Sequence, residues 1–126
     1  MRKKDVNHVQ AWARSVIAMA SKSVFVKVDR PIGFSDKSHA PYPINYGYVP
    51  TVTGGDGEKQ DVYIVSDLIN EPLQSFEGKL IAVVHRADDN EEKWVATTEN
   101  ETFSAAEIAA RIHFMEQYFD STVALV

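Results

Sequence analysis

Short runs of β-branched and aromatic residues fill the middle of this chain and constrain its fold more than any other feature. Such residues favour strands, and each run is bounded by proline, glycine or polar turn residues. No helical pattern lies between the runs, so strands and helices do not alternate as they would around a parallel sheet. The pattern predicts a mainly β domain of the α+β class, with strands at 24–28, 61–66, 79–85 and 93–97 and short extended pieces within 42–50.

The connections between these strands are predicted at 31–41, 53–60, 70–78 and 86–92, where turn-forming and polar residues gather. The last of them joins 79–85 and 93–97 into a hairpin. Because side chains alternate along a strand, Asp61, Tyr63 and Val65 share one face, while Val62 and Ile64 share the other.

Amphipathic helical patterns occupy the two ends of the chain. A helix is predicted over 5–20, with an apolar face of Val9, Trp12, Val16 and Met19. A second helix follows Ser104, which forms a capping box with Glu107, and its apolar stripe is Ile108, Ile112, Met115 and Phe119. We therefore divide the chain into an N-terminal helical extension, 1–22, and a β-rich domain with a C-terminal helix, 23–126.

The size and composition of the chain exclude several classes of protein. Its 126 residues suit one domain, and the absence of cysteine excludes disulfides and thiolate zinc sites. A net charge of −5 disfavours nucleic-acid binding, and no apolar run reaches the ~20 residues that cross a bilayer. We expect a cytoplasmic protein that binds neither nucleic acid nor membrane, with an organelle transit peptide at the basic N-terminus as the alternative.

Carboxylates gather in two separate segments of the sequence. One segment holds Asp56, Glu58 and Asp61, and the other holds Asp88, Asp89, Glu91 and Glu92. Each set alone is typical of a solvated turn. If the fold brings the sets together, their repulsion requires a compensating cation or raised pKa values. Oxygen ligands suit Mg²⁺, Mn²⁺ or Ca²⁺, whereas the four histidines show no spacing for zinc.

Tyrosines and a lysine close to these acids indicate a class of ligand. In strands, tyrosine usually serves packing. Lys93, directly after the second acidic segment, would be an ordinary strand-edge lysine if it had no special neighbours. Beside bound metal ions, however, phenol and ammonium donors suit a polyanionic phosphate, because they bind the oxygens that the metals leave uncovered.

Several motifs together resemble the soluble, metal-dependent inorganic pyrophosphatases. They are YPINYGYVP at 42–50, DGEKQDV at 56–62, the acidic segment ending in Lys93, and HFMEQYFD at 113–120. The resemblance spans about residues 24–120. It implies an OB-like, five-stranded closed β-barrel with peripheral helices, which hydrolyses pyrophosphate to two phosphates with Mg²⁺.

The resemblance also implies roles for individual residues. The metal ligands would be Asp56, Asp61 and Glu91, with Asp88 or Asp89 on a substrate-bound metal and Asp29 at the edge of the cavity. The phosphate ligands would be Tyr46, Lys93 and Tyr118. Glu58 would orient or deprotonate the attacking water, so that Glu58, Asp61, Lys93 and Tyr46 form the catalytic group.

The chain departs from the pattern of this family on the substrate side. The segment between Asp29 and Tyr42 is short and lacks counterparts of the family's lysine and arginine, for which Arg30 and Lys37 are possible replacements. In addition, Glu58 replaces an aspartate, Lys59 a proline and Phe119 a phosphate-binding lysine. Losing charge-assisted bonds of ~1.5–3 kcal/mol each would weaken substrate binding.

Three functions remain open at this level. The first is hydrolysis of pyrophosphate with Mg²⁺, or with Mn²⁺ as an alternative, by a protein that assembles into a homo-oligomer. The second is hydrolysis of another phosphoanhydride by the same metal centre. The third is a non-catalytic barrel that binds a phosphate ligand or a protein partner, a use to which OB-like barrels are often put.

Overall fold

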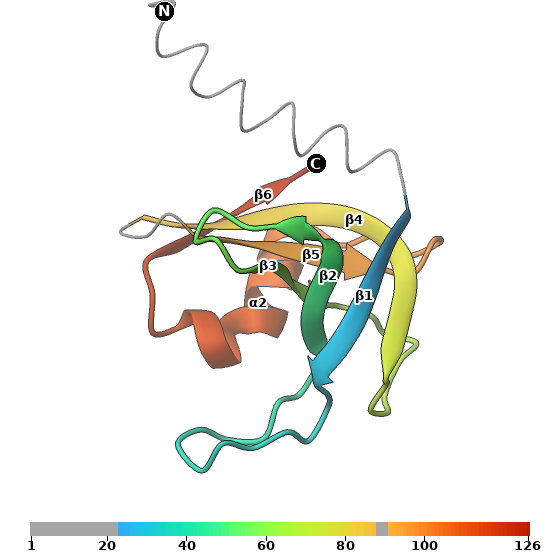
Figure 1. The fold of residues 1–126 in the computed structure, drawn as a ribbon, viewed down its shortest axis with the longest axis horizontal. Coiled ribbons are helices and arrows are strands. Elements are labelled where there is room, and N and C mark those ends of the chain that lie inside the picture. Colours follow the sequence, from blue (N-terminus) through green and yellow to red (C-terminus); the bar gives the residue numbers. More distant parts are fainter. Residues whose placement is uncertain (1–22, 88–90) are drawn as a thin grey trace, which may run out of the picture.

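A computed structural model describes residues 23–87 and 91–126 of the chain (Figure 1). Within these residues the elements are β1 (Ser23–Arg30), β2 (Tyr46–Thr53), β3 (Lys59–Ile64), β4 (Ser75–Arg86), β5 (Glu92–Thr97), α2 (Ala105–Glu116) and β6 (Ser121–Leu125). The predicted helix at 5–20, the proposed extension 1–22 and the two acids Asp88 and Asp89 lie outside the described residues.

The first five strands close into a barrel. The sheet order is β1-β2-β3-β5-β4-β6, and β1 also pairs with β4, which closes the ring. Neighbouring strands run antiparallel except β3 and β5, which are parallel. The predicted five-stranded closed barrel with a C-terminal helix is therefore confirmed. Strand β6 was not predicted; it extends the sheet outside the barrel by pairing with β4.

Two apolar clusters stabilise this arrangement, one on each face of the sheet. The barrel interior holds Val24, Val26, Val49, Val62, Ile64, Phe76, Leu80, Val83, Trp94 and Ala96. The second cluster lies between the outer surface of the barrel, the 31–45 connection and α2, and it includes Tyr46, Tyr63, Val65, Ile108 and Ile112. The predicted alternation along 61–66 is confirmed, because Val62 and Ile64 belong to one cluster and Tyr63 and Val65 to the other.

Two residues of the YPINYGYVP motif have structural functions that the sequence analysis missed. A Cβ at Gly47 would overlap the Lys27 carbonyl, so only glycine permits the close pairing of β1 and β2 at this point. Asn45 is 1% exposed, and its side-chain oxygen accepts from the backbone N–H of Ile32 at 3.0 Å and of Leu73 at 3.1 Å. Asn45 thus ties two connections to the start of β2 and so helps to fix Tyr46.

The strand boundaries correct the predictions at two places. The stretch 42–50 was expected to hold only short extended pieces, but β2 runs from Tyr46 to Thr53. Pro50 is tolerated because the register with β3 shifts between Val49 and Thr53. The predicted connection 70–78 was too long, since β4 begins at Ser75, where it pairs with Lys27 of β1.

The capping box at the start of α2 is confirmed. The Ser104 hydroxyl accepts from the Glu107 N–H at 3.1 Å, and the Glu107 carboxylate accepts from the Ser104 N–H at 2.8 Å. The stripe is correct for Ile108 and Ile112, which are buried, but the helix ends at Glu116, so Phe119 lies beyond it. The prediction is therefore wrong for Phe119.

Ser104→Ala is expected to lower the free energy of unfolding by about 1 kcal/mol, because it leaves the Glu107 N–H without its acceptor. Urea denaturation of the two proteins measures this difference. An unchanged unfolding midpoint would show that water replaces the hydroxyl at no cost.

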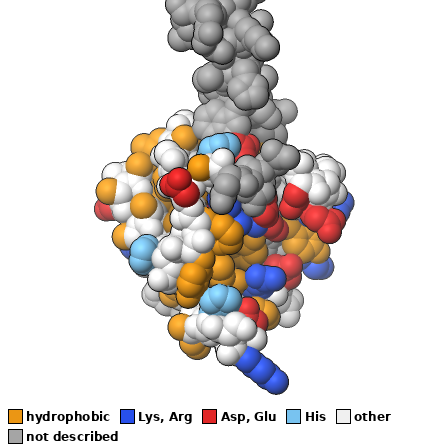
Figure 2. Space-filling view, turned by 90° about the vertical axis from the view of Figure 1, so that its left-hand side faces the viewer, with side chains coloured by type: hydrophobic (Ala, Val, Ile, Leu, Met, Phe, Trp, Pro, Cys, Tyr) orange, Lys and Arg blue, Asp and Glu red, His pale blue; other side chains and the backbone are white. Residues whose placement is uncertain are grey.

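Figure 2 shows how charged side chains are distributed on one face of the described residues. On the face shown in Figure 2, acidic and basic side chains lie side by side beside apolar surface, and the described residues form no continuous basic area there. Among residues 23–87 and 91–126, no helix has the length and apolar character needed to cross a membrane.

Candidate active site

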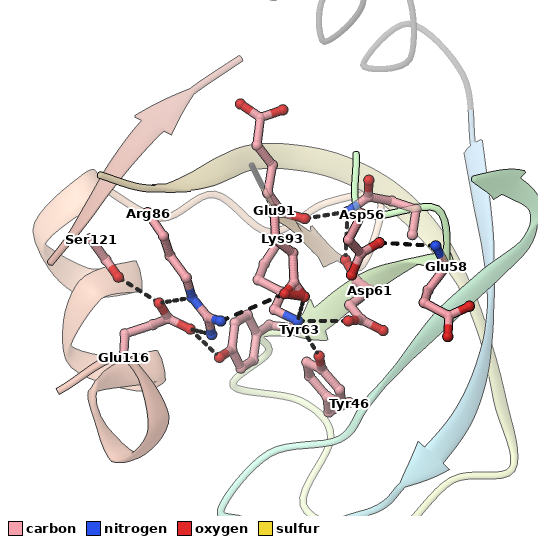
Figure 3. Close-up of polar contacts among 12 residues, drawn as sticks. Tyr46, Asp56, Glu58, Asp61, Tyr63, Arg86, Glu91, Lys93, Glu116 and Ser121 are labelled. Carbon is pink, nitrogen blue, oxygen red and sulfur yellow. Dashed lines mark hydrogen bonds and ion pairs between the residues drawn. The ribbon is translucent and has the colours of Figure 1, made fainter. Parts of the chain in front are cut away.

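The ammonium group of Lys93 lies at the centre of the candidate site. Its Nζ donates to the Tyr46 hydroxyl at 2.9 Å and to Asp61 Oδ2 at 2.6 Å, and it also donates to the Glu91 carboxylate (Figure 3). The side chain of Lys93 is only 7% exposed. Three residues therefore meet around one buried cation, and two of them, Tyr46 and Asp61, are distant from Lys93 in sequence.

The barrel topology explains this meeting. Val62 of β3 is the register partner of Trp94 of β5, so the preceding residues Asp61 and Lys93 are also neighbours. Parallel strands of this kind place residues from distant parts of the chain at the same level of the sheet. The Gln60 amide donates to the Glu92 carbonyl at 2.7 Å and holds the start of β5 against β3.

The positive charge of Lys93 does not balance the negative charge of the carboxylates around it. Two carboxylates share one ammonium, which compensates half of their charge. Burial raises the pKa of Tyr46, and the nearby Asp61 carboxylate raises it further, so the phenol stays protonated. Tyr46 is therefore a neutral hydroxyl that can donate one hydrogen bond while it accepts from Lys93.

A second polar cluster lies next to the first, and we call it the Glu116 cluster. The Arg86 guanidinium donates to Glu116 through Nε at 3.1 Å and through Nη2 at 2.7 Å. The hydroxyls of Tyr63 and Ser121 each donate to the same carboxylate at 2.5 Å. Because both oxygens of Glu116 are satisfied, this charged group is stable although its side chain is 6% exposed.

The sequence analysis missed Arg86 and Glu116, although the sequence contained a signal for each. Arg86 continues the alternation of Ala82 and Val84 along β4, on the face that packs against α2. Glu116 lies four residues after Ile112, on the buried stripe of the helix. Charged residues at two buried positions indicate a pair, but which residues pair is visible only in three dimensions.

The Glu116 carboxyl should titrate below its ordinary range. Burial alone would raise its pKa, but hydrogen bonds from Arg86, Ser121 and Tyr63 outweigh burial and lower the pKa from 4.5. A carboxyl with a lowered folded pKa stabilises the fold fully above its unfolded pKa and loses that contribution as the pH falls through the folded pKa.

We therefore expect the free energy of unfolding to decrease from about pH 4.5 downward more steeply in the wild-type chain than in Glu116→Gln. Urea denaturation at a series of pH values between neutral and strongly acidic measures both slopes. Parallel slopes for the two proteins would contradict the expectation.

The two acids predicted in the 53–60 connection lie in the hairpin turn that follows β2. The Asp56 carboxylate accepts from the Glu58 N–H at 3.0 Å, and Gly57 adopts a positive φ of 86° to close the turn. Both acidic residues are exposed, and Figure 3 shows the Glu58 carboxylate turned away from Lys93. The structure therefore brings Asp61 to Lys93 but leaves Asp56 and Glu58 exposed on the hairpin turn.

Asp29 and Arg30 at the end of β1 lie beside the site. Burial raises the pKa of Asp29, the Arg30 guanidinium opposes this, and the negative charge of Asp61 adds to the increase. Arg30 donates to the Tyr42 hydroxyl at 2.9 Å, and its guanidinium lies 5.8 Å from the centre of the Tyr46 ring. Of the two cationic replacements suggested by the sequence, Arg30 is thus in contact with a residue of the site.

Lys37 and Tyr118 do not contact the Lys93 group. Lys37 is exposed in the connection between β1 and β2, with a φ of 74°. Tyr118 is 59% exposed, and its ring meets that of His39 edge-on at 5.3 Å between centroids. Lys37 lies on the 31–45 connection and Tyr118 just after α2, and both side chains are exposed to solvent.

The donors of the site fit a hard divalent cation in their chemistry. Asp61 and Glu91 direct carboxylate oxygens to one point, and oxygen ligands of this kind suit Mg²⁺, Mn²⁺ or Ca²⁺. In the part of the chain that the structure describes, however, no three acidic or histidine side chains stand close enough to form a complete ligand set. The Lys93 ammonium binds both carboxylates and compensates half of their charge.

Comparison with known proteins gives a consistent family. The inorganic pyrophosphatase family model matches residues 6–120. The inorganic pyrophosphatase of Xylella fastidiosa is 33% identical over 119 residues, an alignment that covers 79% of this chain and 67% of that protein. A Helicobacter pylori inorganic pyrophosphatase is also 33% identical, over 57 residues that cover 44% of this chain and 33% of that protein.

Solved structures extend the similarity to the fold. The inorganic pyrophosphatase of Ehrlichia chaffeensis superimposes with a TM-score of 0.62 at 18% identity, covering 83% of this chain and 86% of that one. The Helicobacter pylori enzyme gives a TM-score of 0.58 at 19% identity, with coverage of 86% and 84%. At these identities the structural likeness establishes the barrel, while the sequence matches establish the relationship.

Proposed function

The chain belongs to the inorganic pyrophosphatase family, and on this premise we propose that it hydrolyses pyrophosphate to two phosphates with a divalent metal ion. The observation that carries the proposal is the convergence of Asp61, Glu91 and Tyr46 on the buried Lys93 ammonium. Mg²⁺ is the proposed ion, with Mn²⁺ as an alternative of similar ligand preference.

Carboxylates of the barrel would hold the metal ions. Asp61 and Glu91 provide the inner pair, with Asp61 as the bridging ligand, and Asp56, Asp29 and either Asp88 or Asp89 complete the set. When bound, such ions lower the pKa of water towards neutrality and neutralise charge on phosphoryl oxygens. The chain's own part in the reaction is to bind and orient the substrate beside them.

Lys93 and Tyr46 would bind phosphate oxygens. The three ammonium protons of Lys93 are used by Tyr46, Asp61 and Glu91, so a carboxylate that turned to a metal ion would release one of them for an oxygen of the leaving phosphate, while the bond to Tyr46 is kept. The protonated Tyr46 hydroxyl supplies a second donor. Both groups are buried before the substrate arrives, and the bond between them limits how far either donor can turn.

Glu58 is the proposed group that orients or deprotonates the attacking water. It lies on the exposed hairpin turn between β2 and β3, and its side chain has one methylene more than the family's aspartate. Arg30, Lys37 and Tyr118 are the proposed outer phosphate ligands, and the contact of Arg30 with the Tyr46 ring favours it among them. Phosphoryl transfer depends mostly on positioning and electrostatics, which this set of residues can provide.

One observation favours a different phosphoanhydride as the substrate. The position of the family's phosphate-binding lysine holds Phe119, whose ring lies on the Arg86 guanidinium at 3.6 Å. A site with fewer cationic side chains available to phosphate would discriminate less strongly between pyrophosphate, whose charge is compact, and larger phosphoanhydrides. A panel of pyrophosphate, polyphosphate and nucleoside triphosphates, compared by kcat/KM, separates these substrates.

The test of the proposed function is phosphate release from pyrophosphate by the purified chain in Mg²⁺ and in Mn²⁺, before and after chelation. We expect turnover with the metal that stops on chelation and returns when the metal is restored. Absence of turnover in every metal, together with tight binding of pyrophosphate in calorimetry, would instead support the non-catalytic barrel.

The assembly and location of the chain remain proposals. Phe25, Leu125 and Val126 expose 39–53% of their surface on the described part of the molecule, which is consistent with burial in a homo-oligomer. Sedimentation equilibrium tests the assembly, and fractionation of the source cells tests the cytoplasmic location.

A further inference from the structure

The Arg86 guanidinium divides its three nitrogens between two carboxylates. Nε and Nη2 bind Glu116 at the end of α2, at 3.1 and 2.7 Å. Nη1 lies 3.7 Å from Glu91 Oε2, while the other oxygen of Glu91 accepts from Lys93. Arg86 therefore connects the Glu116 cluster to the candidate active site (Figure 3).

We propose that Arg86 is a positioning residue: it holds the Glu91 carboxylate in the orientation required for metal binding and couples that orientation to the end of α2. This inference rests on the proposed function, because it concerns one of the proposed metal ligands. Glu91 precedes β5 and does not belong to a strand, so the backbone constrains it less than Asp61. An outer group that fixes such a ligand is what metal sites require.

The charges around Arg86 indicate that it affects metal binding by holding Glu91 in place, and that it does not strongly repel an arriving divalent cation. A lone guanidinium beside Glu91 would oppose the arrival of a divalent cation. Here the bidentate pair with Glu116 already compensates the positive charge, so the pair as a whole is close to neutral. What remains for Glu91 is a fixed, buried partner whose side chain is 6% exposed.

The surroundings of Arg86 favour arginine over lysine. The planar guanidinium can bind Glu116 through two nitrogens and face Glu91 with the third, whereas an ammonium on a flexible stem has no such fork. The Arg86 guanidinium carbon lies 3.6 Å from the centre of the Phe119 ring, a cation–π contact that helps to hold the guanidinium in place. Phe119, which departs from the family's lysine, thus supports an arginine that the pattern of motifs did not include.

The experiment measures Mn²⁺ binding to the full chain without substrate, from the electron paramagnetic resonance signal of free Mn²⁺. The variants are Arg86→Lys, which keeps the charge but loses the fork, and the double variant Arg86→Met/Glu116→Gln, which removes both charges of the pair. The control is Arg111→Met/Asp67→Asn, which removes an exposed arginine–carboxylate pair between α2 and the connection from β3 to β4, away from the site. Circular dichroism establishes that each protein is folded at the temperature used.

We expect both Arg86 variants to raise the Kd for Mn²⁺ about 10-fold, the lower end of the range for lost outer-shell partners, and the control to leave it unchanged. If Arg86 acted only through its charge, Arg86→Lys would bind like the wild type and the double variant would bind no weaker. If its role were only structural, thermal stability would fall with an unchanged Kd. Either result overturns the proposal.

The same samples, assayed for phosphate release, separate this inference from the proposed function. Wild-type turnover with unchanged Kd values in the variants would refute only the role of Arg86. Weakened Mn²⁺ binding in the variants of a chain that does not hydrolyse pyrophosphate would refute only the activity. A wild-type chain that binds neither Mn²⁺ nor Mg²⁺ would refute both.

Discussion

Asp61→Asn is expected to lower kcat/KM for pyrophosphate at least about 10²-fold, the largest effect on activity of any single change proposed for this chain. Asp61 is the proposed bridging metal ligand and also accepts from Lys93 at 2.6 Å. Asparagine keeps the shape but loses the charge, so both metal binding and the orientation of the ammonium suffer. Loss of several kcal/mol of transition-state stabilisation corresponds to a decrease of this size, at 1.36 kcal/mol per factor of ten.

The measurement is steady-state phosphate release at saturating Mg²⁺, with Asp67→Asn as the control. Asp67 is an aspartate whose side chain is 63% exposed, paired with Arg111 away from the site, so its substitution changes the net charge equally. If Asp67→Asn lowered kcat/KM by a similar factor, the loss would be an effect of net charge and not of the position of Asp61. An Asp61→Asn protein with wild-type kcat/KM would exclude Asp61 from the reaction.

Glu116→Ala is expected to lower the free energy of unfolding by about 3–5 kcal/mol, the largest effect on stability. The change leaves Arg86 as a buried charge without its bidentate partner and removes the acceptor of the Tyr63 and Ser121 hydroxyls. Removing one member of a buried pair has a cost of about this size, because the remaining charge stays desolvated. In a domain of ~100 residues, whose total stability is about 5–15 kcal/mol, such a loss is severe.

Urea denaturation at neutral pH measures the loss, and the double variant Arg86→Met/Glu116→Leu is the informative comparison. Because the double variant removes both charges, it should recover much of the stability that Glu116→Ala loses. Asp67→Ala breaks an exposed pair and should cost less than about 1 kcal/mol. Equal losses from Glu116→Ala and the double variant would mean that packing, not the unpaired charge, dominates.

The family and the class of fold could be predicted because their signals are local. The turn residues, the strand-forming runs and the capping box at Ser104 each depend on neighbours within a few positions, and the closed barrel and family relationship that they indicated are confirmed. Predictions failed where tertiary contacts overrode such signals. The stretch 42–50 was expected to hold only short extended pieces, yet β2 continues past Pro50 because a register shift with β3 removes the need for an N–H donor at that position.

The active-site predictions divide in the same way. Four of the residues that the motifs singled out meet at one point: Asp61, Glu91, Lys93 and Tyr46. Their roles in binding metal and substrate stay predictions. The same holds for Asp88 and Asp89, which lie outside the described residues. Lys37 and Tyr118 were grouped with them by similarity of order along the chain. The folded chain places both at the outer surface, which order along the chain does not specify.

The amino-acid sequence alone specifies which residue types are available to the candidate active site, namely carboxylates, tyrosine phenols and a lysine ammonium. The alternation of side chains along each strand also predicted which of them share a face. Barrel closure decided which of them meet, because the parallel pairing of β3 with β5 sets Asp61 beside Lys93 across 32 positions of sequence. The buried Arg86–Glu116 pair belongs wholly to that second level. Its energy arises from desolvation and charge within a packed core, and neither quantity exists until the strands and the helix have come together.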